Sequence, residues 1–436
     1  MEFRMYQDIA IPSGVLLSLS WRDRAQWNFC CGPTKARTYN VQLRDPSTNA
    51  VLSTLYSFST DIETLNATTR VDLVVTRTGT TTAEATVDYV SSDGTASERS
   101  DYLEALGTLH FAANETSKTI TAFIVDDRLG EGAETFNITL GNPVGCTLGS
   151  PAAVVVTINS NEAVNGLNPV QEPSFNTDFF VRQHYIDFSN READASGLAF
   201  WKNQIDECTT PECREIRKIN VSAAFFLSIE FQQTGYLVYK ANQASFNSHE
   251  FLKLRDFLSD TQEIGRGVVI GQPGADAQLE ANKQKFFLDF VQRPKFRNAA
   301  AFPTSMTAEQ FVDKLNANTF DPSASLSGGS LTSVERNALV SQLLPNPASP
   351  TLRAQVLRSL SENALFSNRQ FNRAFVLMQY FGYLRRNPND PPEPLLDFAG
   401  YNFWLNKLNQ FNGDFVNAEM VKAFIISGEY GQRFGP

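Results

Sequence analysis

The stretch Lys118–Leu140, KTITAFIVDDRLGEGAETFNITL, contains two apolar runs separated by an acidic loop. The runs Thr119–Val125 and Glu134–Leu140 are rich in β-branched and aromatic residues, which favour strands. Between them, Asp126–Glu134 holds four carboxylates within nine residues, with Arg128 as its only basic residue. Crowded carboxylates repel one another, and a hard cation such as Ca²⁺, which takes several oxygen ligands, relieves that repulsion. The pattern predicts a strand–loop–strand unit whose loop binds a metal ion.

Further strand-like runs flank this unit at near-regular spacing, and turn residues separate them. They are Val71–Arg77, Ala85–Val90, Gly107–Phe111 and Ala153–Ile158. Short strands with frequent turn signals are typical of an antiparallel sandwich. We therefore expect a β-sandwich over residues 59–162.

The same segment carries the whole net charge of the chain. Residues 59–162 contain 15 Asp and Glu against 5 Lys and Arg, a balance equal to the formal net charge of -10. Such an acidic surface argues against nucleic acid or an anionic membrane as the partner, and favours cations. No apolar run approaches the ~18–20 residues that span a bilayer, and no signal-peptide pattern is visible at the N-terminus.

A chain of 436 residues is too long for one hydrophobic core and predicts several domains. Residues 1–58 contain the strand-like runs Val15–Trp21 and Tyr39–Arg44, too few for a separate sandwich, and indicate part of a jelly-roll-like module. Residues 163–178 are rich in Asn, Pro and Glu and poor in apolar side chains, which indicates a linker.

From residue 179 onward the apolar spacing becomes helical, and an internal repeat is visible. The matching positions are Phe180–Val181 with Phe375–Val376, Tyr185 with Tyr380, Phe188 with Tyr383, Arg191 with Arg386, Gly197–Trp201 with Gly400–Trp404, and Ala224–Phe231 with Ala423–Tyr430. We expect each copy to be a helix, a Gly-containing loop with a buried Trp, and a second helix. A Trp at the same point of two copies is expected to anchor the core rather than to stack a ligand.

The five cysteines show no zinc-ligand spacing, and the three histidines are scattered. Cys208 and Cys213 lie in one short polar loop and are placed to close a small disulfide in an oxidising compartment. The vicinal pair Cys30–Cys31 and the lone Cys146 are expected to be structural or incidental.

The short motifs of residues 59–162 stand in an order that resembles the Calx-beta domain family. They are Thr76–Gly79, Val87–Tyr89, Ser92–Ala96, Ser100–Tyr102, Gly107–Phe111, Glu115–Thr119, Asp126–Asp127, Glu131–Gly132 and Glu134–Phe136. The resemblance covers nearly all of this segment. It implies an immunoglobulin-like sandwich that binds Ca²⁺ in the loops at one end, as in regulators of sodium–calcium exchangers and in extracellular adhesion proteins.

The resemblance also implies a calcium ligand set. Carried onto this chain, the family positions are Glu63, Asp101, Asp126, Asp127, Glu131, Glu134 and Glu162. The acidic tail departs from the family pattern, because Asn159–Glu162 is Asn-Ser-Asn-Glu where binding members carry consecutive Asp residues. Fewer charged ligands imply weaker Ca²⁺ affinity. The alternative is a solvated acidic loop that has kept the fold and lost the metal.

Within the helical region, Tyr185 to Trp201 follows Tyr-x2-Phe-x2-Arg-x2-Asp-x2-Gly-x3-Trp, and Ser228–Phe231 follows Ser-x-Glu-Phe. These patterns are similar to the DUF4214 family of bacterial secreted proteins, and the similarity spans most of residues 179–436. It implies a helical fold, and it implies no activity because that family has no assigned function.

Together these patterns predict a multi-domain, non-enzymatic protein of the extracellular space or cell surface, with an all-β immunoglobulin-like sandwich and an all-α module with an internal repeat. Ca²⁺ at the end of the sandwich is expected to rigidify the domain arrangement in adhesion or assembly, with other surface proteins or glycans as further partners. Acid–base catalysis by the same carboxylates is disfavoured, because the nearby aromatic residues fall on strand positions. Two alternatives stay open: an accessory carbohydrate-binding or spacer region of a secreted enzyme, and a calcium-sensing regulatory module.

Overall fold

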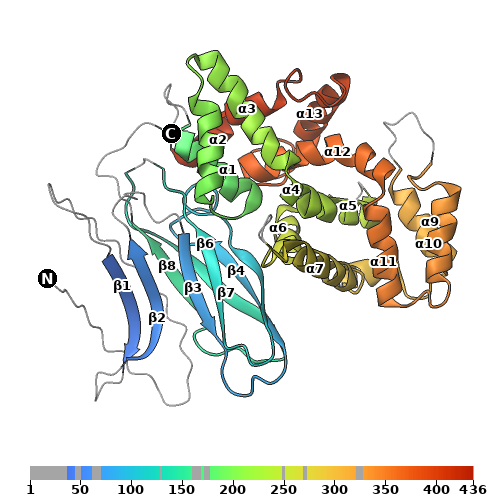
Figure 1. Cartoon of the computed structure of the whole chain (residues 1–436), viewed down its shortest axis with the longest axis horizontal. Coiled ribbons are helices and arrows are strands. Elements are labelled where there is room, and N and C mark those ends of the chain that lie inside the picture. Colours follow the sequence, from blue (N-terminus) through green and yellow to red (C-terminus); the bar gives the residue numbers. More distant parts are fainter. Residues whose placement is uncertain are drawn as a thin grey trace. The chain divides into compact units, whose positions relative to one another are not determined.

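The computed structural model describes residues 37–44, 51–60, 70–127, 130–159, 168–170, 177–247, 251–268, 273–320 and 328–435. The predictions for Val15–Trp21, Glu63, Glu162 and most of the 163–178 linker lie outside these residues. The chain divides into two compact units: Met1–Ser174 together with Gly431–Pro436, and Phe175–Tyr430. Strands characterise the first unit and helices the second (Figure 1).

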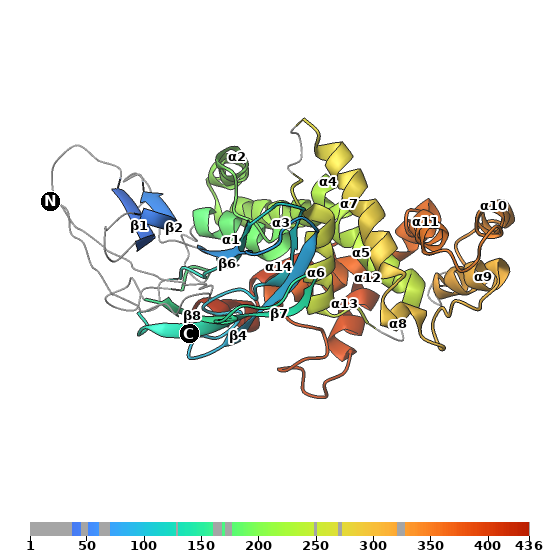
Figure 2. The same cartoon turned by 90° about the horizontal axis from the view of Figure 1, so that it is seen from below.

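The strands of the first unit all pair in antiparallel fashion. They are β1 (Arg37–Arg44), β2 (Val51–Thr60), β3 (Arg70–Thr76), β4 (Ala85–Asp93), β5 (Leu106–Phe111), β6 (Ser117–Phe123), β7 (Glu134–Val144) and β8 (Ala153–Ile158). β1 pairs with β2, β3 pairs with β6, and the remaining strands form a sheet in the order β5-β4-β7-β8. The predicted antiparallel sandwich is confirmed, and Figure 2 shows its two sheets.

The sandwich core is built from alternating strand positions that face inward from both sheets. Leu73 of β3 and Ile120 of β6 meet Val87 and Ile138 of the larger sheet. The predicted boundary between residues 58 and 59 falls inside β2, so that strand runs across it.

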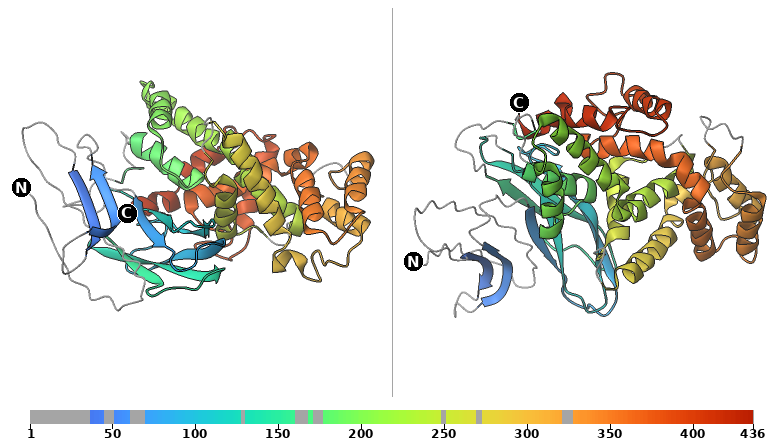
Figure 3. Two further views of the ribbon diagram at one scale, coloured as in Figure 1. Left: turned by 60° about the horizontal axis from the view of Figure 1, so that its bottom comes forward. Right: turned by 45° about the horizontal axis from the view of Figure 1, so that its top comes forward.

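The second unit is built from helices throughout its described residues (Figure 3). They are α1 (Thr177–Ser189), α2 (Ala195–Asp206), α3 (Pro211–Leu227), α4 (Ile229–Gln233), α5 (Gly235–Phe246), α6 (Leu254–Gly265), α7 (Ala275–Phe290), α8 (Pro294–Arg297), α9 (Ala308–Asn318), α10 (Ser333–Leu343), α11 (Pro350–Ser361), α12 (Ala364–Gln379), the π-helix η2 (Tyr380–Leu384), α13 (Ala399–Gln410), α14 (Met420–Ile425) and α15 (Gly428–Gly431). The 3-10 turn η3 (Gln432–Phe434) follows in the chain and belongs to the first unit. Among the described residues, no helix has both the length and the apolar character needed to cross a membrane.

The two copies of the predicted helical repeat contain the same ion pair. Arg191 donates to both carboxylate oxygens of Glu230 at 3.1 and 3.0 Å. Arg386 does the same to Glu429 at 2.6 and 3.0 Å. Planar, two-point contacts of this kind are the strongest form of an arginine–carboxylate pair. We call each of these pairs an Arg–Glu clasp.

The aromatic surroundings of the clasps also repeat. The Arg191 guanidinium lies 4.9 Å from the centre of the Tyr185 ring, and that of Arg386 lies 5.3 Å from the Tyr380 ring. The equivalent contacts of the tryptophans are Trp201 with Phe225 at 6.0 Å and Trp404 with Phe424 at 5.7 Å. The predicted repeat is therefore present in three dimensions.

The tryptophans differ from the prediction in one respect. Trp201 and Trp404 were expected to be buried in loops, but they lie half-buried on the helices α2 and α13. The reason in the first copy is the cap of α2: Asp194 accepts a hydrogen bond from the Gly197 N–H at 2.8 Å. This cap starts the helix at Ala195 and draws the tryptophan into its second turn.

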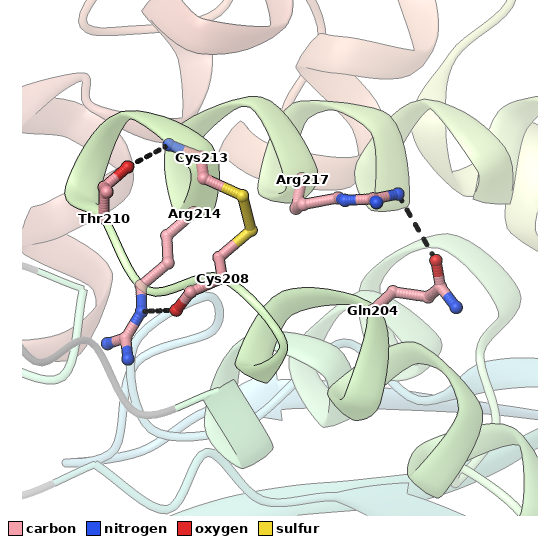
Figure 4. Close-up of a disulfide and its surroundings, with 6 residues drawn as sticks. All are labelled: Gln204, Cys208, Thr210, Cys213, Arg214 and Arg217. Atoms are coloured by element: carbon pink, nitrogen blue, oxygen red, sulfur yellow. Dashed lines mark hydrogen bonds between the residues drawn. A yellow bond between two sulfur atoms is a disulfide. The ribbon is translucent and has the colours of Figure 1, made fainter.

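The predicted disulfide Cys208–Cys213 is present, with a Cα–Cα distance of 5.5 Å (Figure 4). It joins the end of α2 to the first turn of α3. The Thr210 hydroxyl caps α3 by accepting from the Cys213 N–H at 3.3 Å, and Arg214 Nε donates to the Cys208 carbonyl at 3.2 Å. The bridge and these two bonds hold the α2–α3 turn in one conformation.

Removal of this disulfide should destabilise the helical unit. The bridge closes a loop with a sequence separation of 5, and in the chain-entropy description a loop this short contributes about 2 kcal/mol. Chemical denaturation of a Cys208→Ser/Cys213→Ser variant, followed by circular dichroism, should show a loss of that size. The exposed free Cys146 supplies the control: Cys146→Ser should leave the helical transition unchanged, and an equal loss there would contradict the prediction.

Candidate metal centre

The loop from Asp93 to Tyr102, between β4 and β5, is folded back on itself by its own side chains. Asp93 Oδ1 accepts the Tyr102 hydroxyl at 2.6 Å and the Glu98 N–H at 2.8 Å. Arg99 has a φ of 88°, and its N–H donates to the Tyr102 carbonyl at 2.8 Å. Because L-residues rarely adopt such a φ, the surrounding contacts must hold it there. We call residues 93–102 the ligand loop.

Asp101 is the ligand-loop residue whose carboxylate was predicted to bind Ca²⁺. Its Oδ2 accepts the Ser97 N–H at 2.6 Å, and its own N–H donates to the Ser97 carbonyl at 3.1 Å. Its carbonyl accepts the Val125 N–H at 3.0 Å. The backbone of Asp101 is thus joined to Val125, the residue that directly precedes the acidic loop.

Asp101, Glu131 and Glu134 form a group in which one carboxylate oxygen of each lies within 4.8 Å of the others. All three side chains are half-buried. We call this group the carboxylate cluster. It joins the ligand loop to the acidic loop and to the first residue of β7, and brings together three of the seven predicted ligands.

Asp126 and Asp127, also predicted ligands, are half-buried and directly follow Val125, the residue whose N–H bonds to Asp101. They lie outside the group of three defined by the 4.8 Å spacing. The aspartate pair therefore stands at the same end of the sandwich, beside the cluster rather than within it.

The cluster holds a proton more tightly than isolated carboxyl groups do. Burial, the negative charges of Asp101 and Glu131 and a hydrogen bond with Asp101 together raise the pKa of Glu134 from 4.5 to about 7. Three carboxylates this close cannot all ionise cheaply, so a proton or a cation must offset one of the charges. The cluster thus offers carboxylate oxygens of the kind that can hold a cation.

Calcium affinity should consequently rise with pH. Because the raised pKa of Glu134 favours the protonated form in the folded, metal-free protein, its contribution to stability is present below about pH 4.5 and lost as the pH rises through about 7. Thermal unfolding in a chelator should show this loss between about pH 4.5 and 7, and calcium affinity should increase over the same range. A Glu134→Gln variant should lack this pH dependence of stability and calcium affinity. Identical pH profiles of the variant and the unmodified protein would contradict the prediction.

A model of the Calx-beta domain family matches residues 53–162. This part of the chain is therefore a Calx-beta domain, and the resemblance stated from its motifs is confirmed. The match begins inside β2 and ends at residue 162. The similarity of residues 179–436 to the DUF4214 family stays a prediction.

The chain is similar to two kinds of curated relative. It is 36% identical over 96 residues to Extracellular matrix protein 3 of Lytechinus variegatus, which covers 20% of this chain and 3% of that protein. It is 32% identical over 119 residues to Sodium/calcium exchanger 1 of Canis lupus familiaris, which covers 23% of this chain and 12% of the exchanger. The chain thus spans only a small part of the length of these relatives.

Among solved structures, the apo-form Calx CBD1 domain is 31% identical to this chain, with a TM-score of 0.21, and the alignment covers 21% of this chain and 83% of that one. The calcium binding domain CBD12 of CALX1.1 is 30% identical, with a TM-score of 0.21, over 22% of this chain and 40% of that one.

Sequence reasoning missed Asp93 as a structural partner of the site. Its hydrogen bonds to Tyr102 and Glu98 organise the ligand loop, yet in the sequence it looks like an ordinary turn residue before Gly94. Its role could have been inferred from its residue type, because an acidic side chain close to a predicted acidic site needs hydrogen-bond donors around it.

Proposed function

We propose that the Calx-beta domain binds Ca²⁺ at the carboxylate cluster and that the bound ion fixes the direction in which the chain leaves the sandwich. One observation carries this proposal. Glu134, a member of the cluster, is paired in register with Ile158, the last residue of β8. The chain therefore exits the sandwich beside the cluster, so an ion bound there acts at the start of the segment that leads to the helical unit.

The charge balance of the cluster supports calcium as its occupant. Three half-buried carboxylates with oxygens within 4.8 Å of one another, and the aspartate pair Asp126–Asp127 beside them, provide the oxygen-rich, flexible surroundings that Ca²⁺ takes. The remaining predicted ligands, Glu63 and Glu162, lie outside the described residues and stay predictions. Asn159 follows β8 directly and offers a neutral amide oxygen in place of a carboxylate.

The wider role that we propose is non-enzymatic: calcium-dependent rigidification of an extracellular or cell-surface protein in adhesion or assembly. Two observations support this setting. One relative is an extracellular matrix protein, and the Cys208–Cys213 bridge suits an oxidising compartment. Under this proposal the helical unit is a DUF4214-like module that contacts other surface proteins or glycans.

Small-angle X-ray scattering of the full chain tests the rigidification. With saturating Ca²⁺ the distribution of interatomic distances should narrow relative to a chelated sample, because fewer orientations of the exit segment remain. Asp101→Asn should remove the difference between the two conditions. Superimposable profiles for the unmodified protein with calcium and with chelator would rule out the rigidifying role.

A calcium-sensing regulatory role is the second candidate, favoured by the similarity to Sodium/calcium exchanger 1. The two roles differ in affinity: a sensor needs a Kd of roughly 10⁻⁷–10⁻⁵ M, whereas extracellular modules bind at roughly 10⁻⁴–10⁻³ M. The reduced number of tail carboxylates favours the weaker range.

A further inference from the structure

We propose that Tyr102 is a positioning residue for the carboxylate cluster: its hydroxyl, through Asp93, and its ring, through Phe136, hold Asp101 and Glu134 at their mutual distance before any ion arrives. This inference rests on the proposed calcium function. It assigns no ligand atom to Tyr102.

The first half of the device is the hydroxyl. Tyr102 directly follows Asp101, its side chain is 1% exposed, and its hydroxyl donates to Asp93 Oδ1 at 2.6 Å. Because Asp93 is the last residue of β4, this bond ties the end of the ligand loop to its beginning.

The second half is the ring. The rings of Tyr102 and Phe136 stack with centroids 4.1 Å apart and planes 9° from parallel. Phe136 is fully buried and lies two residues after Glu134 on β7. The Tyr102 ring therefore contacts β7, the strand that carries Glu134, and Tyr102 itself directly follows Asp101 in the chain.

The ligand loop is also attached to β7 by its backbone. The Ala96 N–H donates to the Thr135 carbonyl at 2.9 Å, and the Thr135 N–H donates to Thr95 Oγ1 at 2.8 Å. A Cβ at Gly94 would stand 2.4 Å from the Thr135 carbonyl oxygen, so this close approach requires glycine. Thr135 separates Glu134 from Phe136, so these contacts converge on the same three residues of β7.

Fixing the geometry in advance matters because the like charges of ionised Asp101 and Glu134 repel each other when neither a proton nor a cation lies between them. Groups that orient metal ligands without touching the metal typically change its affinity by about 10–100-fold when they are removed. Tyr102→Phe keeps the ring and its stacking on Phe136 and removes only the hydroxyl. It isolates the positioning role from packing of the core.

The test measures calcium affinity and amide hydrogen exchange in the full chain, for the unmodified protein and for Tyr102→Phe. The matched control is Thr108→Val, which removes another hydroxyl bonded to an aspartate, Thr108 Oγ1 to Asp88 Oδ1 at 2.6 Å. We expect Tyr102→Phe to weaken Ca²⁺ binding at least about tenfold, and Thr108→Val to leave the affinity within about twofold at a comparable loss of stability.

In the metal-free protein, the amides of Ser97 and Glu98 should exchange about fivefold faster in Tyr102→Phe than in the control. Unchanged affinity in Tyr102→Phe, with binding intact in the unmodified protein, would overturn the positioning role and leave the calcium site standing. Equal exchange rates of these amides in Tyr102→Phe and Thr108→Val would also overturn the positioning role, and this measurement needs no calcium. Absence of binding in the unmodified protein would instead reject the calcium proposal.

Discussion

Glu134→Gln should stabilise the metal-free Calx-beta domain and abolish its stabilisation by calcium. In the chelated protein the change removes a charge that burial and the neighbouring Asp101 and Glu131 disfavour. In the presence of calcium it removes a charged ligand. At a calcium concentration of about 100 times Kd, the unmodified domain should gain about 2.7 kcal/mol, which corresponds to a rise in Tm of roughly 10–20 °C for a domain of this size.

The prediction is specific because the substitution should raise the stability of the metal-free domain and remove the stabilisation by calcium. Thermal unfolding followed by circular dichroism, once with chelator and once with calcium, measures both effects. Glu84→Gln is the control, since Glu84 is exposed and precedes β4 at the end away from Asp93. It should leave both the chelated stability and the calcium response unchanged. A Glu134→Gln protein that is less stable in chelator and still fully stabilised by calcium would contradict the proposed cluster.

Arg386→Ala should produce the largest loss of stability in the helical unit. The Arg386 side chain is 7% exposed, clasps Glu429, and donates to the carbonyls of Asn387, Pro388 and Asp390 at 3.0, 3.1 and 3.2 Å. Its removal takes away both guanidinium bonds to a largely buried carboxylate and the bond to the Pro388 carbonyl, whereas the Asn387 and Asp390 carbonyls keep the N–H groups of Asp390 and Glu393 as donors. Breaking a buried pair by deleting one partner costs about 3–5 kcal/mol.

The other copy of the repeat provides a matched control for this substitution. Arg191 makes the same clasp, but its side chain is 42% exposed and that of Glu230 is 32% exposed. Arg191→Ala should therefore cost only about 1 kcal/mol. Urea denaturation of both variants, compared at equal m-values, measures the difference. Equal losses for Arg191→Ala and Arg386→Ala would show that burial does not set the strength of the clasp.

Much of the sandwich could be predicted from the sequence because its strands obey a simple period. Runs such as Val71–Arg77 and Ala153–Ile158 alternate or continue as apolar strands, and the structure places β3 and β8 there. The pairing order β5-β4-β7-β8 depends on contacts between strands far apart in the chain. Local periodicity carries no information about such contacts.

The sequence predicted which acidic residues belong to the candidate site better than it predicted how their carboxylates are arranged. The resemblance pointed to Asp101, and the structure brings it within 4.8 Å of Glu131 and Glu134. It could not show that Asp126 and Asp127 stand beside this group, because small rotations of an irregular loop decide which carboxylates converge. The part played by Tyr102 was also hidden, since its position indicated only a core aromatic residue.

The Arg–Glu clasps were missed although their residues had been aligned. Both copies of the repeat contain the Arg and the Glu, in Arg191 with Glu230 and in Arg386 with Glu429. An arginine and a glutamate present at matching positions of both copies were the signal that could have revealed the contact. Arg191 and Arg386 lie in loops, after α1 and after η2, whereas Glu230 and Glu429 lie in α4 and α15, so no helical period connects the partners.

Calorimetric titration of the metal-free full chain with calcium chloride at about pH 8, above the pKa of Glu134, tests calcium binding most directly. We expect saturable heat with a Kd at or below about 10⁻³ M, and its loss in an Asp101→Asn/Glu134→Gln variant that keeps its circular dichroism spectrum. An unmodified, folded protein that gives no saturable heat would contradict the existence of a calcium site in this domain.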